Sequence, residues 1–276
     1  MRSELTVRQE ITLRNLERAH SHEHELSYGE VPSVIYQGSD AKHGNFLPES
    51  YRAIQNNPNW TQRLKKAYTG SRWVPRSGER KRFELDCANS SDALLMNVFC
   101  YPRVLLRLDL CALLGVERGL QPVFGFRPGA RLRNGKADRT EIDMRLGNLL
   151  IETKLTESGF QTAPLRLIER YRDLNQVFDI TDLPIRNEIV SGYQLIRSVL
   201  AAYASDCSFA LLCDSRRVDL IESWATVMRA VRSYSFRSQL KVITWQEISA
   251  TLPRKLQKFL KDKYGIVCPQ NLSSRA

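Results

Sequence analysis

Long apolar runs are missing from the sequence. The most hydrophobic stretch, LLRLDLCALLGV, is interrupted by Arg107 and Asp109, whereas a membrane-spanning helix needs about 20 predominantly apolar residues. The N-terminal stretch MRSELTVRQEITLRNLERAH is charged throughout and has no apolar core of the kind found in secretory signal peptides. We therefore expect a cytoplasmic protein with no membrane partner.

Closely spaced cysteines are also missing. The six cysteines are scattered and form no CxxC motif, so nothing indicates a zinc site or an iron-sulfur cluster. Most of them lie in apolar patterns, where a reduced cysteine packs as a small hydrophobic residue. The histidines His20, His22 and His24 have no acidic or thiol partner at metal-binding spacing, and we expect them at the surface near a helix end.

The stretch TEIDMRLGNLLIETKLTE, residues 140–157, combines a turn signal with two short alternating segments. Gly147 and Asn148 form a preferred two-residue hairpin loop with glycine at positive φ. Counting outward from this loop pairs Leu146 with Leu149, Arg145 with Leu150, Met144 with Ile151, Asp143 with Glu152, Ile142 with Thr153 and Glu141 with Lys154. Because strand side chains alternate, one face is expected to form core and the other to carry Glu141, Asp143, Glu152 and Lys154.

The predicted register places Asp143 directly opposite Glu152, with Cβ atoms about 5 Å apart. At an effective dielectric near 20, two such charges repel by roughly 3 kcal/mol, so a compensating charge is expected. A divalent cation supplies it, because Mg²⁺ is usually held by one or two carboxylates together with waters and substrate phosphates. Lys154 lies two residues beyond Glu152 on the same face, within reach of the same volume.

Asp143 followed by Glu152-Thr153-Lys154 resembles the PD-(D/E)XK nuclease superfamily, in particular its bacterial restriction-type members. The resemblance implies hydrolysis of phosphodiester bonds with Mg²⁺, for which Mn²⁺ is a substitute. It also implies that Asp143 and Glu152 bind the metal with the Thr153 carbonyl as a third ligand, and that Lys154 positions or deprotonates the attacking water and stabilises charge on the phosphate. This sequence departs from the family pattern at Ile142, where the family has proline.

Two further residues are expected to support the site. Glu141, opposite Lys154, is predicted to hold the lysine or to extend the metal site. Gln194 is predicted to contact the site from a later helix, where relatives often place an accessory polar residue. The Gln-x-x-x-Tyr pattern of exonuclease-like relatives is not met, because Ser198 stands at the tyrosine position, and this disfavours a processive exonuclease.

An acid-x-Lys triplet alone has little specificity, because Asp40-Ala41-Lys42 and Glu79-Arg80-Lys81 also occur in polar stretches. The strand, the turn and the opposed Asp143 together distinguish the triplet at Glu152. The alternative interpretation is a hairpin with a solvated charged face, in which Glu141 and Lys154 form a simple cross-strand ion pair.

The order of predicted elements agrees with the superfamily core, an α/β fold of helix, three strands, helix and strand, with a mixed sheet flanked by helices. The expected elements are a helix over residues 90–115 that is kinked or divided at Pro102, a strand over 122–126, the hairpin, a helix over 191–203, a strand over 208–213, and a strand and helix over 241–252. Residues 86–276 are therefore predicted to form the nuclease-like domain. Residues 1–85 are predicted to form a helical N-terminal extension, with helices over 4–20 and 48–68.

Positive charge exceeds negative charge, with 41 Lys and Arg against 30 Asp and Glu and a net charge of +11, which is consistent with a polyanionic partner. Three groups contain many of the basic residues: Arg72, Arg76, Arg80, Lys81 and Arg82; Arg127, Arg131, Arg133, Lys136 and Arg139; and Arg254, Lys255, Lys258, Lys261 and Lys263. We expect the first and third groups to be solvated faces. The second precedes the hairpin and is predicted to contact phosphates.

These features predict a Mg²⁺-dependent DNA endonuclease, restriction-like or acting in DNA repair. Two alternatives stay open. One is a catalytically inactive nuclease fold that serves as a nucleic-acid-binding or interaction module, and the other is a regulatory domain whose acidic face binds metal structurally. Cutting both strands of DNA requires a dimer or successive nicks, and a homodimer is expected on that ground.

Overall fold

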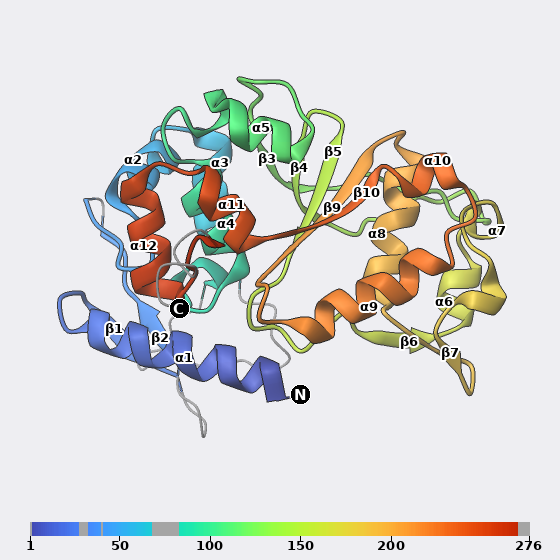
Figure 1. The fold of residues 1–276 in the computed structure, drawn as a ribbon, viewed down its shortest axis with the longest axis horizontal. Coiled ribbons are helices and arrows are strands. Elements are labelled where there is room, and N and C mark those ends of the chain that lie inside the picture. The colour runs from blue at the N-terminus through green and yellow to red at the C-terminus, as the bar shows by residue number, and fades with distance from the viewer. Residues whose placement is uncertain (1, 28–32, 40, 68–82, 270–276) are drawn as a thin grey trace. The chain divides into compact units, whose positions relative to one another are not determined.

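The computed structural model describes residues 2–27, 33–39, 41–67 and 83–269 (Figure 1). Contacts within the chain define two compact units. The sheet unit comprises Gln121–Thr244, and the helical unit combines Arg2–Leu120 with Trp245–Ala276. The chain is thus divided after residues 120 and 244, and the proposed extension of residues 1–85 stays a prediction. Asp40 and the basic group from Arg72 to Arg82, which includes the triplet at Glu79, lie outside the described residues.

The helical unit contains most of the helices that were expected near the two ends of the chain. Its elements are α1 (Arg2–Ala19), β1 (His24–Leu26), β2 (Val34–Tyr36), α2 (Pro48–Gln55), α3 (Pro58–Leu64), η1 (Glu84–Asp86), α4 (Ser91–Phe99), η2 (Val104–Leu106), α5 (Leu108–Leu114), α11 (Trp245–Thr251) and α12 (Arg254–Tyr264). The antiparallel β1–β2 pair lies between the two helices that were expected over residues 4–20 and 48–68. Strands of three residues are too short to give a clear alternating signal.

Two of the expected helices are divided at proline. Asn57 caps α3 by accepting a hydrogen bond from Asn59 N, and Pro58 opens the helix, so residues 48–68 contain two helices. The helix expected over residues 90–115, predicted to be kinked or divided at Pro102, is divided there, and Arg103 adopts a left-handed conformation with φ 61° between α4 and η2. Proline interrupts a helix in this way because it lacks the N–H and clashes with the preceding turn.

Lys263 was expected on a solvated basic face, but it lies on the inner side of α12 and is fully buried. Its Nζ donates to Asn15 Oδ1 at 2.6 Å and lies 4.9 Å from the ring centroids of both Tyr36 and Tyr264. Burial, assisted by the positive charge of Arg18, lowers the pKa of Lys263 well below its ordinary value. The folded state therefore disfavours the protonated amine.

Replacing Lys263 with methionine is expected to remove a pH-dependent destabilisation. The unfolded lysine, with a pKa of about 10.5, binds more protons than the folded one, so wild-type stability rises with pH up to that value. The stability advantage of Lys263→Met over wild type should shrink by up to about 1.4 kcal/mol per pH unit between about pH 7 and 9. Urea unfolding at several pH values measures this trend. Lys258→Met, on the exposed side of α12, should show no such trend, and a pH-independent difference for Lys263→Met would contradict the prediction.

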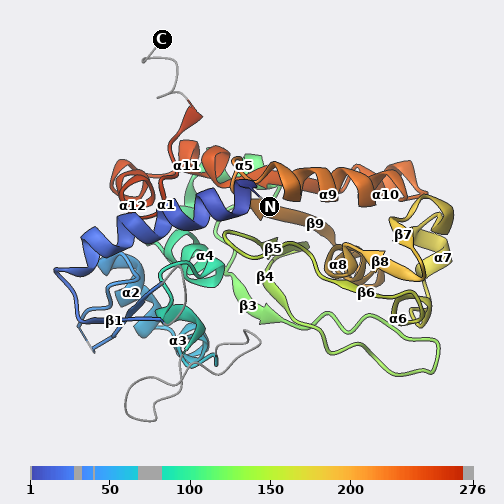
Figure 2. The same cartoon turned by 90° about the horizontal axis from the view of Figure 1, so that it is seen from below.

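A mixed five-stranded sheet forms the centre of the sheet unit, in the order β10-β9-β5-β4-β3 (Figures 1 and 2). Its strands are β3 (Val123–Phe126), β4 (Ile142–Leu146), β5 (Leu149–Thr153), β9 (Ser208–Cys213) and β10 (Leu240–Thr244). The β3–β4–β5 meander is antiparallel, and β5, β9 and β10 are parallel. The predicted mixed α/β fold is confirmed, but the expected first core helix, residues 90–115, is grouped with the helical unit.

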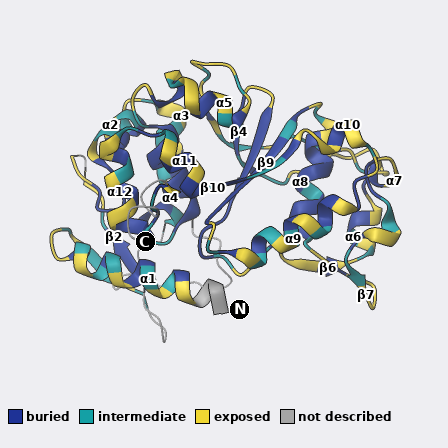
Figure 3. Ribbon diagram, viewed as in Figure 1, coloured by how far each residue is buried: buried dark blue, intermediate teal, exposed yellow. Residues whose placement is uncertain are grey.

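Helices and a small second sheet complete the sheet unit. They are α6 (Arg166–Glu169), α7 (Leu174–Val177), η3 (Ile180–Asp182), α8 (Tyr193–Ala204), α9 (Val218–Arg229) and α10 (Tyr234–Arg237), with β6 (Thr162–Pro164), β7 (Ile185–Arg186) and β8 (Ile189–Ser191) in the order β6-β8-β7. The helix expected over 191–203 is α8. Apolar residues of α8 join Leu150, Phe209 and Leu211 of the central strands in one core, and these strands are buried (Figure 3).

Candidate active site

The hairpin of β4 and β5 has the predicted turn and the predicted register. Gly147 adopts φ 60°, and the paired residues are Leu146–Leu149, Arg145–Leu150 and Met144–Ile151. Beyond these pairs, Asp143 Oδ2 accepts hydrogen bonds from Thr153 N at 2.8 Å and from Thr153 Oγ1 at 2.7 Å. The carboxylate of Asp143 is therefore fixed against the end of β5.

The expected division of the hairpin into a core face and a charged face holds for only one strand. Residues of β4 alternate between buried and half-buried, but β5 is buried along its whole length. The reason is the parallel neighbour β9, which pairs Leu150 with Phe209 and Glu152 with Leu211, since strands inside parallel sheets are covered on both faces. The alternative of a solvated charged face is therefore wrong for Glu152 and Lys154, which are 2% and 6% exposed.

Glu152 is held by two donors from different elements. Its Oε1 accepts a hydrogen bond from Lys154 Nζ at 3.1 Å and another from Gln194 Nε2. Gln194 lies in the first turn of α8, and its backbone N–H donates to Phe160 O at 2.9 Å. The structure thus brings together four of the residues singled out from the sequence, namely Asp143, Glu152, Lys154 and Gln194.

The ammonium of Lys154 lies in a buried and strongly negative environment. Burial alone lowers the pKa of Lys154, but the carboxylates of Glu152, Glu157 and Asp143 together outweigh burial and raise the pKa above its ordinary value. The Nζ atom also lies 5.8 Å from the centroid of the Phe160 ring. Lys154 is therefore protonated at neutral pH in this arrangement.

The chain matches the family described as Restriction Endonuclease associating with ARP over residues 14–265. It belongs to this family. The predicted restriction-endonuclease-like membership is thereby confirmed. No curated protein and no solved structure matches the chain.

Two residues of this restriction-endonuclease family member, Glu157 and Arg217, lie at the site but were not predicted from the sequence. Glu157 Oε2 accepts a hydrogen bond from Leu155 N at 2.6 Å, and its charge acts on Lys154. Arg217 is fully buried and donates to Leu155 O at 3.1 Å and to Glu157 O at 2.9 Å. Glu157 could have been predicted, because it lies in the same acidic stretch of the sequence as Glu152.

Two acid–arginine pairs follow β9, the strand next to β5. Asp214, which is fully buried, accepts hydrogen bonds from Arg216 at 2.9 and 2.6 Å. Arg217 binds both carboxylate oxygens of Asp219 at 2.9 and 2.7 Å. The sequence DSRRVD therefore contributes paired charges beside the end of β5, where Lys154 N donates to Leu212 O.

The remaining predicted residues occupy less defined positions. Glu141 is half-buried one residue before β4, and its role stays a prediction, as does metal binding by the Thr153 carbonyl. His24 Nδ1 lies 3.0 Å from His22 O.

Among the described residues, no group of three or more His, Cys, Asp or Glu side chains is arranged to hold a metal ion. Within the same residues, no helix has both the length and the apolar character required to span a membrane.

Proposed function

We propose that the chain is a Mg²⁺-dependent DNA endonuclease of restriction type, with the helix–strand order of a PD-(D/E)XK core. The observation that carries the proposal is the buried Glu152–Lys154 pair, held by Gln194 beside the carboxylate of Asp143. Burying such a pair costs desolvation free energy that apolar residues would not cost. Membership in a restriction endonuclease family supports the interpretation that Glu152 and Lys154 are buried here because nuclease chemistry requires their charges.

The carboxylates fit a hard divalent cation. Asp143, Glu152 and Glu157 all act on the ammonium of Lys154, so carboxylate oxygens from more than one strand lie near this position. Mg²⁺ prefers oxygen ligands and needs only one or two carboxylates, because waters and substrate phosphates complete its coordination. Asp143 and Glu152, with the Thr153 carbonyl, would hold the ion, and Mn²⁺ accepts the same donors. When bound, the ion polarises the scissile phosphate and lowers the pKa of a bound water.

Lys154 contributes a positive charge to the reaction. Because the surrounding carboxylates raise its pKa, it is an ammonium at neutral pH and donates hydrogen bonds to phosphate oxygens as negative charge develops on them. Gln194 orients Glu152 by donating to Oε1, an outer contact of the kind that fixes a metal-binding carboxylate.

Incubation with supercoiled plasmid DNA and Mg²⁺ tests the proposal. We expect nicked and then linear DNA, complete loss of cleavage with excess EDTA, and recovery when Mg²⁺ or Mn²⁺ is restored in excess. Asp143→Asn, which keeps the side-chain shape and removes the charge, should lose cleavage and retain plasmid binding. Cleavage that persists in EDTA would contradict a metal-dependent mechanism.

The second candidate function is a nuclease-fold protein that binds nucleic acid or a partner without cutting. The Glu152–Lys154 ion pair favours it in one respect, since the two charges satisfy each other without metal. The family description also names an association with ARP. Binding of plasmid without nicking of any DNA form would establish this alternative. A homodimer, proposed for cutting both strands, is tested by sedimentation of the protein with and without DNA.

A further inference from the structure

The loop between β3 and β4 is an ordered structure joined to the segment around α6. Within the loop, Arg131 pairs with Ala137 in an antiparallel bridge. Leu132 forms a second antiparallel bridge with Tyr171, so the loop runs beside residues 166–172 (Figure 2). Arg133 N donates to Arg170 O at 2.8 Å, and Arg172 N donates to Arg131 O at 3.1 Å. Residues 127–139 and 166–172 therefore form one connected surface.

Four arginines surround the Leu132–Tyr171 bridge. Tyr171 is buried and Leu132 packs against the core, whereas the arginines at the neighbouring positions reach solvent. Arg131 and Arg133 flank Leu132, Arg170 and Arg172 flank Tyr171, and all four are exposed. The hydrogen bonds of the bridge place Arg131 opposite Arg172 and Arg133 opposite Arg170. Arg170 has a helical backbone at the end of α6, and its Cζ lies 5.8 Å from the centroid of the Tyr171 ring. We call these four residues the arginine face.

The charge of the arginine face is only partly neutralised within the described residues. Arg172 is paired with Asp173 at 2.8 Å, and the hydroxyl of Tyr171 and the carboxylate of Asp138 act on Arg170. Arg131 and Arg133 lie in a segment where Glu169 is the one exposed acid of residues 127–139 and 166–172. Arg127, Lys136 and Arg139 of the same loop are exposed as well. Like charges placed opposite each other across strands are destabilising, so a bound polyanion would relieve their repulsion.

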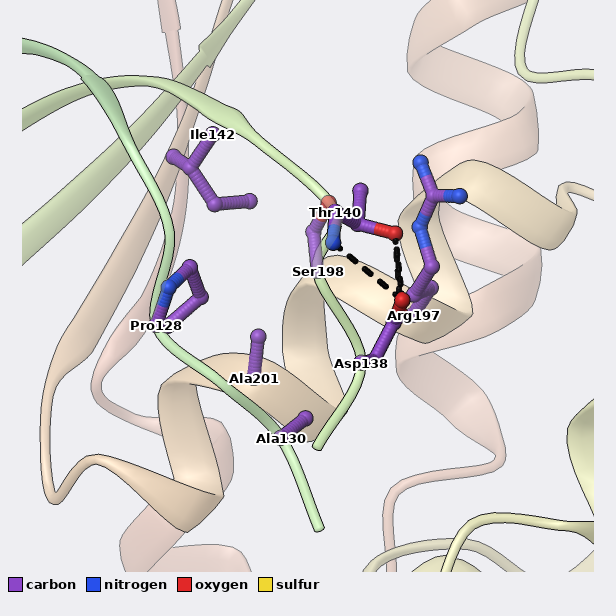
Figure 4. A pocket seen from close by; sticks show the side chains of 8 residues that line it. All are labelled: Pro128, Ala130, Asp138, Thr140, Ile142, Arg197, Ser198 and Ala201. Atoms are coloured by element: carbon purple, nitrogen blue, oxygen red, sulfur yellow. Dashed lines mark hydrogen bonds between the residues drawn. The ribbon is translucent and has the colours of Figure 1, made fainter. Parts of the chain in front are cut away.

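A partly buried hydrogen-bonded anchor, formed by Tyr171, Asp138 and Thr140, holds the arginine face in place. The hydroxyl of Tyr171 donates to Asp138 Oδ2, and Thr140 Oγ1 donates to the same carboxylate at 2.8 and 2.9 Å (Figure 4). Burial raises the pKa of Asp138, but the hydrogen bonds from Tyr171 and Thr140 outweigh burial and keep it below its ordinary value. The anchor is therefore an ionised carboxylate that ties the loop to the α6 segment.

The anchor also connects the arginine face to the candidate active site. Asp138 precedes Asp143 by five residues, which span at most about 17 Å. Arg197 lines the same pocket as Asp138 and Thr140 (Figure 4), and its buried Nε has no hydrogen-bond partner among the described residues. Arg197 lies three residues after Gln194 on α8, about 4.5 Å along the helix axis. A strand with phosphates about 3.4 Å apart along a duplex axis covers these distances within a few nucleotides.

We propose that the arginine face binds the phosphate backbone of duplex DNA beside the cleavage position, an inference that rests on the proposed function and extends it to a specific surface. Tyr171 is a positioning residue in this arrangement, because it fixes the loop through Asp138 and does not itself face outward. The face positions the duplex without reading bases, since contacts to phosphates carry no direct sequence information.

The test measures the affinity of the full chain for a short fluorescent DNA duplex in EDTA over a range of salt concentrations. The variant combines Arg131→Gln, Arg133→Gln and Arg170→Gln. Its matched control combines Arg254→Gln, Lys258→Gln and Lys261→Gln, which removes the same charge from the exposed side of α12. Three lost phosphate contacts should weaken binding about a hundredfold near 0.1 M salt and make the log–log salt slope shallower by about three. The control should change the affinity by less than about threefold.

Tyr171→Phe separates positioning from direct contact. It keeps the buried ring but removes the donor to Asp138, so affinity should fall by about threefold with the salt slope unchanged. An unchanged slope in the triple arginine variant, an equal loss in the α12 control, tighter binding of duplex RNA than of DNA, or absence of metal-free binding by wild type would each overturn the arginine face. These results are independent of plasmid cleavage in Mg²⁺, so a failure of this inference is distinguishable from a failure of the proposed function.

Discussion

Lys154→Met is expected to slow DNA cleavage in Mg²⁺ by about 10³-fold, the upper range for loss of one group that stabilises transition-state charge. The structure gives the reason, because Lys154 is a buried ammonium next to Glu152 and its pKa is raised by three carboxylates. Methionine retains a similar length and removes the charge. Single-turnover cleavage of a radiolabelled duplex measures the chemical step directly.

The pH profile and the metal affinity of Lys154→Met distinguish charge stabilisation from a structural role. If Lys154 only stabilises charge, wild type and Lys154→Met should show the same pH dependence of the rate between about pH 7 and 9, whereas loss of a general base would change the profile. Removing the positive charge leaves the carboxylates more negative, so Mn²⁺ should bind the variant at least as tightly as wild type in calorimetric titration. Lys261→Met, an exposed substitution on α12, should leave the rate unchanged. Weakened Mn²⁺ binding with normal cleavage at saturating metal would contradict the assigned role.

The part of the site that is local in sequence could be predicted from sequence. The turn at Gly147 and strict alternation fix which residues of the hairpin face each other, and the observed pairs from Leu146–Leu149 to Met144–Ile151 follow from that rule. Gln194 was selected only through the family resemblance, and the structure brings it to Glu152. No periodicity in α8 identifies which strand residue its first turn contacts.

The rest of the site depends on partners that are distant along the chain. Burial of β5 on both faces results from its pairing with β9, which lies about sixty residues later in the chain. The alternating pattern of the hairpin residues does not predict this pairing. The same holds for Arg217. An Arg-Arg dipeptide predicts solvent-exposed side chains, and only the folded structure shows that Arg217 binds the carbonyls of Leu155 and Glu157. The short strands β6, β7 and β8 escaped detection because elements of two or three residues provide no usable period.

Arg217→Met is expected to destabilise the sheet unit by about 3–5 kcal/mol, the usual cost of removing one partner of a buried charge pair. Arg217 is fully buried, and its guanidinium donates hydrogen bonds to two backbone carbonyls and to both oxygens of Asp219. Methionine fills part of the volume but leaves Leu155 O and Glu157 O without this donor. Lysine retains the charge but lacks the planar fork, so Arg217→Lys should recover only part of the stability. Urea unfolding gives the free energies, and hydrogen exchange of β5 and β9 amides assigns the loss to the sheet unit.

The same substitution links stability to the candidate chemistry. Arg217 binds the carbonyls of Leu155, the residue directly after Lys154, and of Glu157, and so fixes the segment that carries Glu157 toward the ammonium. We therefore expect folded Arg217→Met protein to cleave DNA more slowly than wild type, because the loosened segment no longer holds Lys154 next to Glu152. Arg229→Met, an exposed change on the same helix, should alter stability by less than about 0.5 kcal/mol and leave cleavage intact. Wild-type stability of Arg217→Met would show that the carbonyls of Leu155 and Glu157 are satisfied without the guanidinium. The contacts of Arg217 with these carbonyls would then have no role in holding the site.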